Sequence, residues 1–303
     1  MRIGIIFNSK AGSASQLAGL RETLDKHPDV TLWEPDSAAA VIAQTGRAAA
    51  EGYEVVIAAG GDGTIHNVVN GLAPDFARVR LGIIPLGTGN DLRRTLAIPE
   101  DPLAAFELAR NGPERRIDVI RVEAANATTY CVNVAAGGFS GQLDEALTDE
   151  LKATWGPLAY LRGALDVLPD LTSYRTFLRL DDGPSERVEA LNVIVANGRT
   201  AAGGYAVASQ ANPEDGLLDV VIVRYGPLLD LAGVAARLLA GDYLNSAQVT
   251  LQRARRVFID SQPGMWFNVD GELLTKEPIT FTVQPRALRV AVGPAYTPTP
   301  AES

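Results

Sequence analysis

The chain has 303 residues, of which 47% are hydrophobic and 21% charged, a composition that suits a soluble protein with a sizeable core and enough length for two domains. Its net charge of −9 opposes general attraction to nucleic acid or to anionic lipid, so we expect no nucleic-acid partner. Because Cys131 is the only cysteine, the sequence excludes an intrachain disulfide and a cysteine-built zinc site, which fits a reducing cytoplasm.

The first third of the chain alternates strand-like and helix-like segments. The apolar patterns predict strands at residues 2–7, 30–33, 54–59 and 80–85, and helices at 13–26, 37–51 and 64–72. Strands that alternate with helices usually pair in parallel through right-handed crossovers. The sequence therefore predicts an α/β nucleotide-binding domain in this part of the chain.

The residue pattern changes after about Glu123. Short β-rich runs dominate, joined by turns that contain Gly, Pro, Asp or Asn, and this is typical of an antiparallel sandwich or barrel. A helical insertion is expected at about 143–171. No apolar run reaches the ~20 residues that a membrane-spanning helix needs.

Glycine-rich turns follow three of the predicted strands, with the sequences "FNSKAGS", "GGDGT" and "PLGTGND". Glycine lets the backbone approach a ligand closely, and the amide groups at a helix N-terminus favour phosphate. In a parallel sheet the carboxyl ends of neighbouring strands adjoin, so these turns would converge at one edge. No Walker loop or Rossmann fingerprint is present, and "GGDG" alone is equally compatible with a tight strand-to-helix connection.

Two carboxylates, Asp62 and Asp91, lie in the second and third of these turns. An anion alone would be repelled by them, whereas a phosphate chain that carries Mg²⁺ would be attracted. Lys10 in the first turn has the charge to meet a β- or γ-phosphate, although a solvated loop lysine is the simpler interpretation. The pattern favours a magnesium–phosphate ligand.

Eight motifs stand in order along the chain: "NSKAGS", "GGDGTIHNVVNGL", "PLGTGNDL", "RRIDV", "NVAAGGFSG", "VANGRTAAGGY", "NPEDGLLDV" and "VDGE". This set, from about Arg2 to Gly293, resembles the diacylglycerol-kinase catalytic-domain family, which includes bacterial soluble lipid kinases, sphingosine kinases and ceramide kinase. NAD kinases and phosphofructokinases are more distant relatives. The resemblance implies an N-terminal α/β ATP-binding domain at 1–123 with a returning segment at about 285–297. It also implies a C-terminal antiparallel β-sandwich domain for the lipid at 124–284, with the active site in the cleft.

The resemblance implies ATP and Mg²⁺ as cofactors and assigns residues to each. The implied ATP-binding positions are Asn8, Ser9, Lys10, Ala11, Gly12, Gly60, Gly61, Asp62, Gly63, Thr64, Ile65, His66, Gly87, Thr88, Gly89 and Asn90. The implied acidic network that holds the catalytic Mg²⁺ through water is Asp62, Asp91 and Asp118. A separate structural Mg²⁺ site would use the Asp215 carboxylate and the carbonyls of Asn212 and Leu217.

The "VDGE" turn resembles the catalytic turn of these kinases, where one acid takes the proton from the lipid hydroxyl. We favour Asp270 as this base, with Glu272 orienting the nucleotide or sharing the role, and Asp62 as the third catalytic acid. Taken alone, Asp-Gly at this position would be read as an ordinary hairpin turn.

The chain departs from the family pattern at three places. His66-Asn67 stands where many bacterial members have Asn-Glu, although histidine is familiar there from sphingosine and ceramide kinases. Pro35 replaces a threonine expected near the nucleoside, and Ser209 replaces a proline before the structural metal loop.

The sequence thus predicts a cytoplasmic lipid kinase that transfers the γ-phosphate of ATP to a hydroxyl of diacylglycerol or a related lipid. We expect peripheral contact with a membrane surface, the acyl chains lying in an apolar cleft bounded by the helical insertion, and a homodimer because related kinases are often dimers. One alternative is a NAD kinase-like phosphotransferase with a soluble substrate, which "GTGNDL" and "DGLLDV" oppose. Another is a catalytically silent nucleotide-binding protein, which the intact acidic residues oppose.

Overall fold

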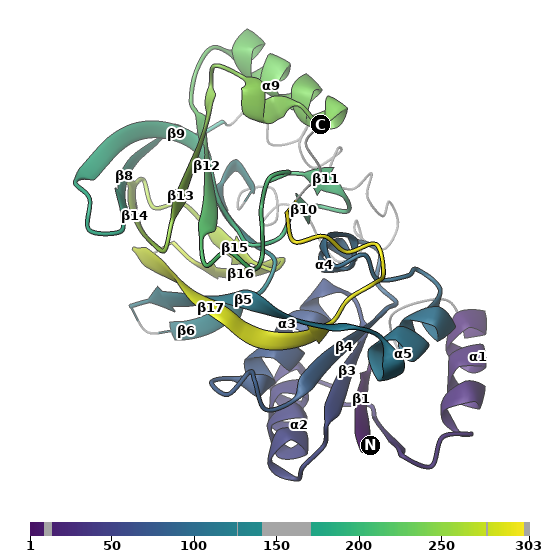
Figure 1. The fold of residues 1–303 in the computed structure, drawn as a ribbon. Coiled ribbons are helices and arrows are strands. Elements are labelled where there is room, and N and C mark those ends of the chain that lie inside the picture. The colour runs from purple at the N-terminus through teal and green to yellow at the C-terminus, as the bar shows by residue number, and fades with distance from the viewer. Residues whose placement is uncertain (9–13, 126, 141–170, 277, 300–303) are drawn as a thin grey trace.

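The computed structural model describes residues 1–8, 14–125, 127–140, 171–276 and 278–299, and Figure 1 shows its fold. The expected helical insertion at 143–171 lies outside the described residues, apart from Leu171. The ATP contacts expected at Ser9, Lys10, Ala11 and Gly12 lie outside them as well.

The N-terminal part alternates strands and helices as the sequence predicts. The elements are β1 (Ile3–Phe7), α1 (Ala14–Leu24), β2 (Val30–Trp33), α2 (Ala38–Ala50), β3 (Val55–Gly60), α3 (Asp62–Leu72), β4 (Arg80–Pro85), α4 (Asp91–Thr95) and α5 (Pro102–Asn111). Strands pair in parallel in the order β4-β3-β1-β2. Helix α5 is not among the predicted elements, although Asp101 caps it by accepting a hydrogen bond from the Ala104 amide at 2.8 Å.

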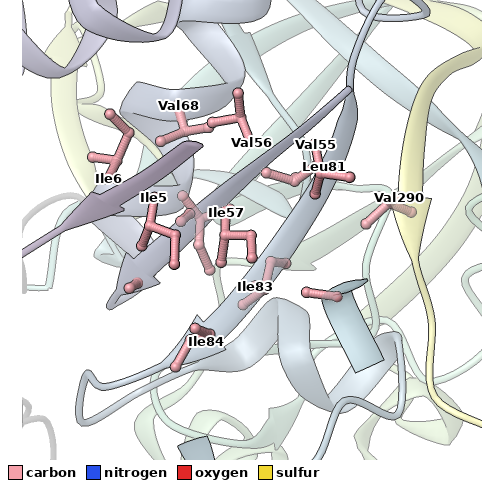
Figure 2. Close-up of a cluster of buried hydrophobic side chains, with 14 of the residues drawn as sticks. Ile5, Ile6, Val55, Val56, Ile57, Val68, Leu81, Ile83, Ile84 and Val290 are labelled. Atoms are coloured by element: carbon pink, nitrogen blue, oxygen red, sulfur yellow. The ribbon is translucent and has the colours of Figure 1, made fainter. Parts of the chain in front are cut away.

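The core of this part lies between the parallel sheet and its helices. Every residue of β1 and β3 is buried, because helices cover both faces of the sheet and the strands are continuous apolar runs. Figure 2 shows how Ile5, Ile57 and Val68 of the strands and α3 gather there, with Val290 reaching in from a strand near the C-terminus.

The C-terminal part consists mainly of antiparallel strands. They are β5 (Glu114–Ala124), β6 (Ala127–Cys131), β7 (Val134–Gly138), β8 (Tyr174–Leu180), β9 (Ser185–Ala196), β10 (Thr200–Ala201), β11 (Tyr205–Ala206), β12 (Leu218–Arg224), β13 (Val249–Ala254), β14 (Arg256–Gln262), β15 (Phe267–Val269), β16 (Glu272–Thr275) and β17 (Ile279–Ala291). One long helix, α9 (Leu228–Ala240), and a short 3₁₀ turn at Tyr243–Asn245 complete the described elements. The predicted β-rich second half is confirmed.

Both faces of the sheet around β9 and β12 are buried. Val193 and Val195 of β9 contribute to one apolar cluster, whereas Ile194 and Ala196 contribute to another, as the two-residue period of a strand requires. Leu231 and Val234 of α9 cover the second cluster. The first cluster also contains Ile120 of β5 and Phe281 of β17, so strands pack against one another across it.

Strand β17 connects the two parts of the molecule. It pairs antiparallel with β5 and β14, and at its end Val290 pairs in parallel with Leu81 of β4. A single sheet therefore runs from one part into the other (Figure 1). The border expected at 123/124 and the return at 285–297 stay predictions. Among the described residues, no helix has the length and apolar character to cross a bilayer.

Candidate active site

The glycine turns "GGDGT" and "PLGTGND", which follow β3 and β4, are in contact at the carboxyl ends of these strands. A Cβ atom added to Gly87 would lie 2.4 Å from the Cα atom of Gly61, so neither turn has room for a side chain at the contact. The Leu86 amide also donates to the Gly60 carbonyl at 2.9 Å. The convergence expected from parallel strand order is therefore present.

The N-terminus of α3 opens onto this contact. Gly61 is its N-cap and, having no side chain, leaves the first turn without a side-chain cap. Thr64 packs against Gly60, and Asn8 at the end of β1 donates to the Thr64 hydroxyl at 3.4 Å. Backbone amides and a helix dipole are thus directed to one place, as a phosphate group requires.

An acid pair lies beside the turns. The Asp62 carboxylate accepts a hydrogen bond from the Asp91 amide at 3.0 Å. A Cβ atom on Gly89 would lie 2.8 Å from Asp62 Oδ2 and 3.5 Å from Asp91 Oδ2, so this glycine fits between the two carboxylates. The sequence places both acids here, and the structure brings them together.

The electrostatics of the acid pair suit a cation. Burial, and next the charge of Asp91, raise the pKa of Asp62 to about 6. Asp91 itself accepts a hydrogen bond from the Gly203 amide at 2.9 Å and lies 3.5 Å from the Arg94 guanidinium. A divalent cation would offset the repulsion between the two carboxylates, so these residues fit a magnesium–phosphate ligand.

Other expected ATP contacts differ in how their side chains lie. Ile65 is 2% exposed and packs in the core, which leaves only its backbone for a ligand. Asn90, with φ of 48°, turns its amide back on Gly87, accepting from its N–H at 3.1 Å and donating to its carbonyl. Thr88 is exposed at the turn. As ATP contacts these positions stay predictions.

Asp118 does not join Asp62 and Asp91 in one direct cluster. Its two carboxylate oxygens accept backbone hydrogen bonds from Arg286 at 2.6 Å and Gly216 at 2.7 Å. Within the described part of the chain, no three His, Cys, Asp or Glu side chains are arranged to hold a metal ion. The expected network, in which Asp62, Asp91 and Asp118 hold Mg²⁺ through water, therefore stays a prediction.

The expected structural metal loop is internally hydrogen-bonded. Asn212 accepts from the Glu214 amide through its side chain at 3.0 Å, and Asp215 accepts from the Leu217 amide at 2.9 Å. Asp215 remains exposed, and its charge adds to burial in raising the pKa of Asp118. A cation would relieve this repulsion, so the loop fits one.

Sequence reasoning missed Glu214 in the same loop. Arg115 holds this buried carboxylate with two hydrogen bonds of 2.9 and 2.7 Å, and the Tyr296 hydroxyl donates to it at 3.0 Å. Nothing in the sequence pairs Arg115-Arg116 and Glu214-Asp215 shows that Arg115 and Glu214 will form an ion pair. Glu214 ties the loop to β5 and to the C-terminal segment.

The Asp270 carboxylate is enclosed on all sides. Its side chain is 3% exposed. The groups that donate to it are the His66 imidazole at 3.2 Å, the Cys131 thiol at 3.1 Å, and the amides of Val132, Asn133 and Val134 at 3.0, 3.0 and 3.3 Å. Burial alone would raise the pKa of Asp270, but the hydrogen bond and charge of His66, with the thiol and amide donors, lower it below its ordinary value. Sequence reasoning missed these backbone donors, which leave no side-chain pattern.

His66 connects α3 with the "VDGE" turn. Burial opposes its protonation, but Asp270 and, more weakly, Glu272 raise the pKa of His66 above its ordinary value. Because the Asp270 carboxylate can only accept, His66 Nδ1 carries the proton between them. On the other side of the ring, Nε2 lies 3.3 Å from the Asn70 amide nitrogen. The departure from Asn-Glu at this position therefore forms a buried contact.

Glu272 lies in the open, unlike Asp270. It is exposed, and its Oε1 atom lies 3.0 Å from where a Cβ atom on Gly63 would be. The side chain therefore reaches the first turn of α3, next to the acid pair.

Comparison with known proteins supports these observations. Residues 2–122 match the family model described as "Diacylglycerol kinase catalytic domain", and residues 133–292 match "YegS C-terminal NAD kinase beta sandwich-like domain". The chain is 33% identical over 276 residues to "Diacylglycerol kinase" of Bacillus subtilis (strain 168), with 89% of each chain covered. It is 30% identical over 285 residues to "Diacylglycerol kinase" of Staphylococcus aureus (strain bovine RF122 / ET3-1), covering 92% of this chain and 89% of the other.

A solved structure has the same fold. The crystal structure described as that of a diacylglycerol kinase from Bacillus anthracis str. Sterne superposes with a TM-score of 0.81 at 24% sequence identity, covering 97% of this chain and 98% of that one. The family models, the two relatives and the shared fold agree, and this chain belongs to the diacylglycerol kinase catalytic-domain family.

Proposed function

We propose that this protein is an ATP- and Mg²⁺-dependent lipid kinase that phosphorylates a hydroxyl of diacylglycerol or a related lipid. The observation that carries the proposal is the acid pair Asp62 and Asp91 beside two touching glycine turns at the N-terminus of α3. The relatives named diacylglycerol kinase support the lipid as the acceptor.

In this proposal the glycine turns bind the phosphates of ATP and the acidic residues bind Mg²⁺. The backbone at Gly60–Thr64 and Gly87–Gly89, with Asn8, Ile65, His66 and Asn90 around it and residues 9–12 beyond β1, would hold the phosphates of ATP. Asp62 and Asp91 would hold the catalytic Mg²⁺, with Asp118 acting through water, and Asp215 with the carbonyls of Asn212 and Leu217 would hold a second ion. When bound, Mg²⁺ supplies neutralisation of charge on the transferring phosphoryl group. Most of the catalysis then comes from holding the lipid hydroxyl in line with that group.

The lipid hydroxyl must lose a proton during transfer. A carboxylate at the "VDGE" turn can accept it, and positioned bases contribute about 10²- to 10⁴-fold to such reactions. Because the acceptor is a bilayer lipid and none of the described helices could span a membrane, we propose peripheral contact from the cytoplasmic side. Association into a homodimer stays a prediction.

The decisive experiment incubates the purified protein with radiolabelled ATP, Mg²⁺ and total lipid extract, and then identifies the labelled product. We expect a labelled lipid from the wild type and none from the matched variant Asp91→Asn. Binding of ATP without any labelled lipid across a broad panel would refute the lipid kinase. A parallel incubation with NAD tests the alternative suggested by the NAD kinase-like second domain, and formation of NADP would favour it.

A further inference from the structure

A loop of the C-terminal part, residues 197–204, reaches across to the start of α4. The Gly203 amide donates to Asp91 Oδ2 at 2.9 Å, and the Thr200 hydroxyl donates to the Asp91 carbonyl at 3.1 Å. Asp91 is only 5% exposed. A loop from one part of the molecule therefore holds one carboxylate of the acid pair that the other part supplies.

The contact with Gly203 is the closer of two that hold the Asp91 carboxylate. Among the described residues, the other donor to this carboxylate is the Arg94 guanidinium, at 3.5 Å. A hydrogen bond of this kind fixes the orientation of a carboxylate toward a metal ion, and its loss typically lowers metal affinity about 10- to 100-fold. The position of the Gly203 amide therefore matters for a cation at the acid pair.

The backbone of the 197–204 loop needs support from outside. Ala202, Gly203 and Gly204 have φ of 54°, 86° and 116°, which places three left-handed residues in a row. A residue with a side chain, such as Ala202, keeps this conformation only where the surrounding structure imposes it. The pairing within the loop is short, since β10 and β11 are in register at only two positions. The direction of the Gly203 amide thus depends on what anchors the loop.

Arg199 anchors the loop near its start. Its backbone amide donates to the Thr95 hydroxyl of α4 at 3.0 Å. Its guanidinium donates to the Ala211 carbonyl at 3.0 Å and to the carbonyls of Thr297 and Pro298, both at 2.7 Å. The planar fork of a guanidinium can meet several carbonyls at once, whereas a lysine ammonium is a compact charge on a flexible stem.

The chain after β17, which receives the Arg199 side chain, is itself attached beside α4. The Gly293 amide donates to the Leu96 carbonyl at 2.9 Å, directly after α4. The Tyr296 hydroxyl donates to the Glu214 carboxylate at 3.0 Å. Figure 1 shows this segment running past α4 and β10. Arg199 therefore fastens the loop to a segment that is already fixed to the N-terminal part.

We propose that Arg199 is a positioning residue that sets the affinity for Mg·ATP by keeping the Gly203 amide on Asp91. This inference rests on the proposed function, in which Asp91 holds the catalytic Mg²⁺. The effect passes from the guanidinium, through the backbone of the 197–204 loop, to one carboxylate oxygen. The C-terminal part and the chain after β17 thereby contribute to a metal site whose acids come from the N-terminal part.

The test titrates Arg199→Lys and wild type with ATP by calorimetry, once in Mg²⁺ and once in EDTA. Affinity in Mg²⁺ should fall by about 10- to 100-fold. Affinity for metal-free ATP should stay unchanged, because the glycine turns are not altered. In a kinase assay with a diacylglycerol in mixed micelles, KM for Mg·ATP should rise by the same factor, and excess Mg²⁺ should restore kcat to within about threefold of wild type.

Arg80→Lys is the matched control. Arg80 is half-buried like Arg199, and it also donates to three backbone carbonyls, which are those of Ala109, Arg110 and Gly112. It begins β4, at the opposite end of the strand from the glycine turn. The control should lower the melting temperature, as Arg199→Lys should, and leave the affinity for Mg·ATP unchanged.

Two further proteins test the route through Asp91. Thr200→Val removes the hydroxyl that donates to the Asp91 carbonyl and keeps the shape of the side chain, so it should also weaken Mg·ATP binding. This variant tests the loop even if Arg199→Lys does not fold. In the Asp91→Asn background, Arg199→Lys should cause no further loss of affinity, since its effect passes through the Asp91 carboxylate.

Three results would overturn the inference. The first is an unchanged affinity for Mg·ATP in folded Arg199→Lys, or in Thr200→Val where the lysine variant does not fold. The second is an equal loss with and without Mg²⁺, as a general disturbance of the nucleotide site would give. The third is an additive loss in the Asp91→Asn background. A wild type that binds Mg·ATP and phosphorylates no lipid would instead refute the lipid kinase alone, because the titrations require no lipid.

Discussion

Asp62 shows how a residue of the proposed active site can weaken the fold that carries it. Its carboxylate begins α3, where the helix dipole favours a negative charge, yet burial and Asp91 outweigh this and raise its pKa to about 6. An acid whose pKa is higher in the folded state than the ordinary 3.8 binds its proton more tightly when folded. Protonation of Asp62 therefore stabilises the protein below about pH 4, and this contribution is lost as the pH rises through 6.

Replacing Asp62 by asparagine should accordingly stabilise the metal-free protein at neutral pH. The amide oxygen can still accept the Asp91 N–H, and the repulsion with Asp91 is gone. We expect ~1–3 kcal/mol of added stability at pH 7.5, and no difference from wild type near pH 4. Urea unfolding at the two pH values measures this. Equal stabilities at pH 7.5 would contradict the prediction, as would a gain that persists at pH 4. Mg²⁺ with ATP should stabilise the wild type and have little effect on the variant.

The Cys131 thiol is enclosed together with the Asp270 carboxylate. The thiol is fully buried and donates to Asp270, and burial together with the Asp270 charge raises its pKa well above the ordinary value. Because the thiolate is the reactive form, we expect no reaction with a disulfide reagent in the native protein and full reaction in denaturant. Labelling that is complete within minutes under native conditions at pH 8 would show that the Asp270 enclosure opens readily.

The acid pair and the Asp270 enclosure differ in how far sequence can reveal them. Asp62 and Asp91 follow neighbouring parallel strands, so strand order alone places them together. The enclosure of Asp270 is made by backbone amides more than 130 residues away, at Val132, Asn133 and Val134. Amides are present at almost every position, so only the three-dimensional pairing of β15 with β7 reveals which ones converge.

Elements with a strong local signal were predictable, and their ends were less so. Strands β1, β3 and β4 are buried apolar runs and occur where the pattern places them. Helix α3 begins at Asp62, two residues before the predicted start at Thr64, because the glycines that suggest a turn can also adopt helical angles. Helix α5 was missed although Asp101 and Pro102 form a recognisable start.

The contact between the two glycine turns predicts that a single added methyl group will disturb both turns. In Gly87→Ala, the new Cβ atom would lie 2.4 Å from Gly61 Cα, so β3–α3 and β4–α4 would have to move apart. We expect ATP affinity to fall at least tenfold, by isothermal titration, with the fold retained by circular dichroism. Gly233→Ala in α9 is the matched control, because its added Cβ would meet no atom within 4 Å apart from its chain neighbours and the backbone of its own helix. That control should bind ATP normally and gain about 0.5–1 kcal/mol of stability. Normal ATP binding by Gly87→Ala would contradict the prediction and show that the contact between the glycine turns is not part of the nucleotide site.

Strand pairing joins the two parts of the molecule that composition separates. Composition separates an alternating first part from a β-rich second part, but it does not show which strands become neighbours. Strand β17 belongs to the second part by its position in the chain and its β-rich character. It nevertheless pairs with β5 along most of its length and with β4 at its end. Ile117 and Val119 of β5 face the N-terminal core, whereas Ile120 and Val122 face the other. Pairing at such sequence separation leaves no local pattern, so the continuous sheet does not follow from the residues themselves, and only the family resemblance implies a returning segment at about 285–297.

This pairing predicts that residues 1–123 cannot fold alone. That fragment lacks β17, which pairs with both β4 and β5. Leu81 then loses its strand partner Val290, and Ile117 loses Leu288. The edges of β4 and β5 that face β17 are left without hydrogen-bond partners. We expect no cooperative thermal transition and strong binding of a hydrophobic dye. Joining residues 285–299 to the fragment through a flexible linker should restore a cooperative transition, because it returns the strand that pairs with Ile117 and reaches Leu81. The intact protein should unfold in one transition, since the sheet couples both parts. A fragment of residues 1–123 that unfolds cooperatively without the added strand would show that the N-terminal core is independent of β17.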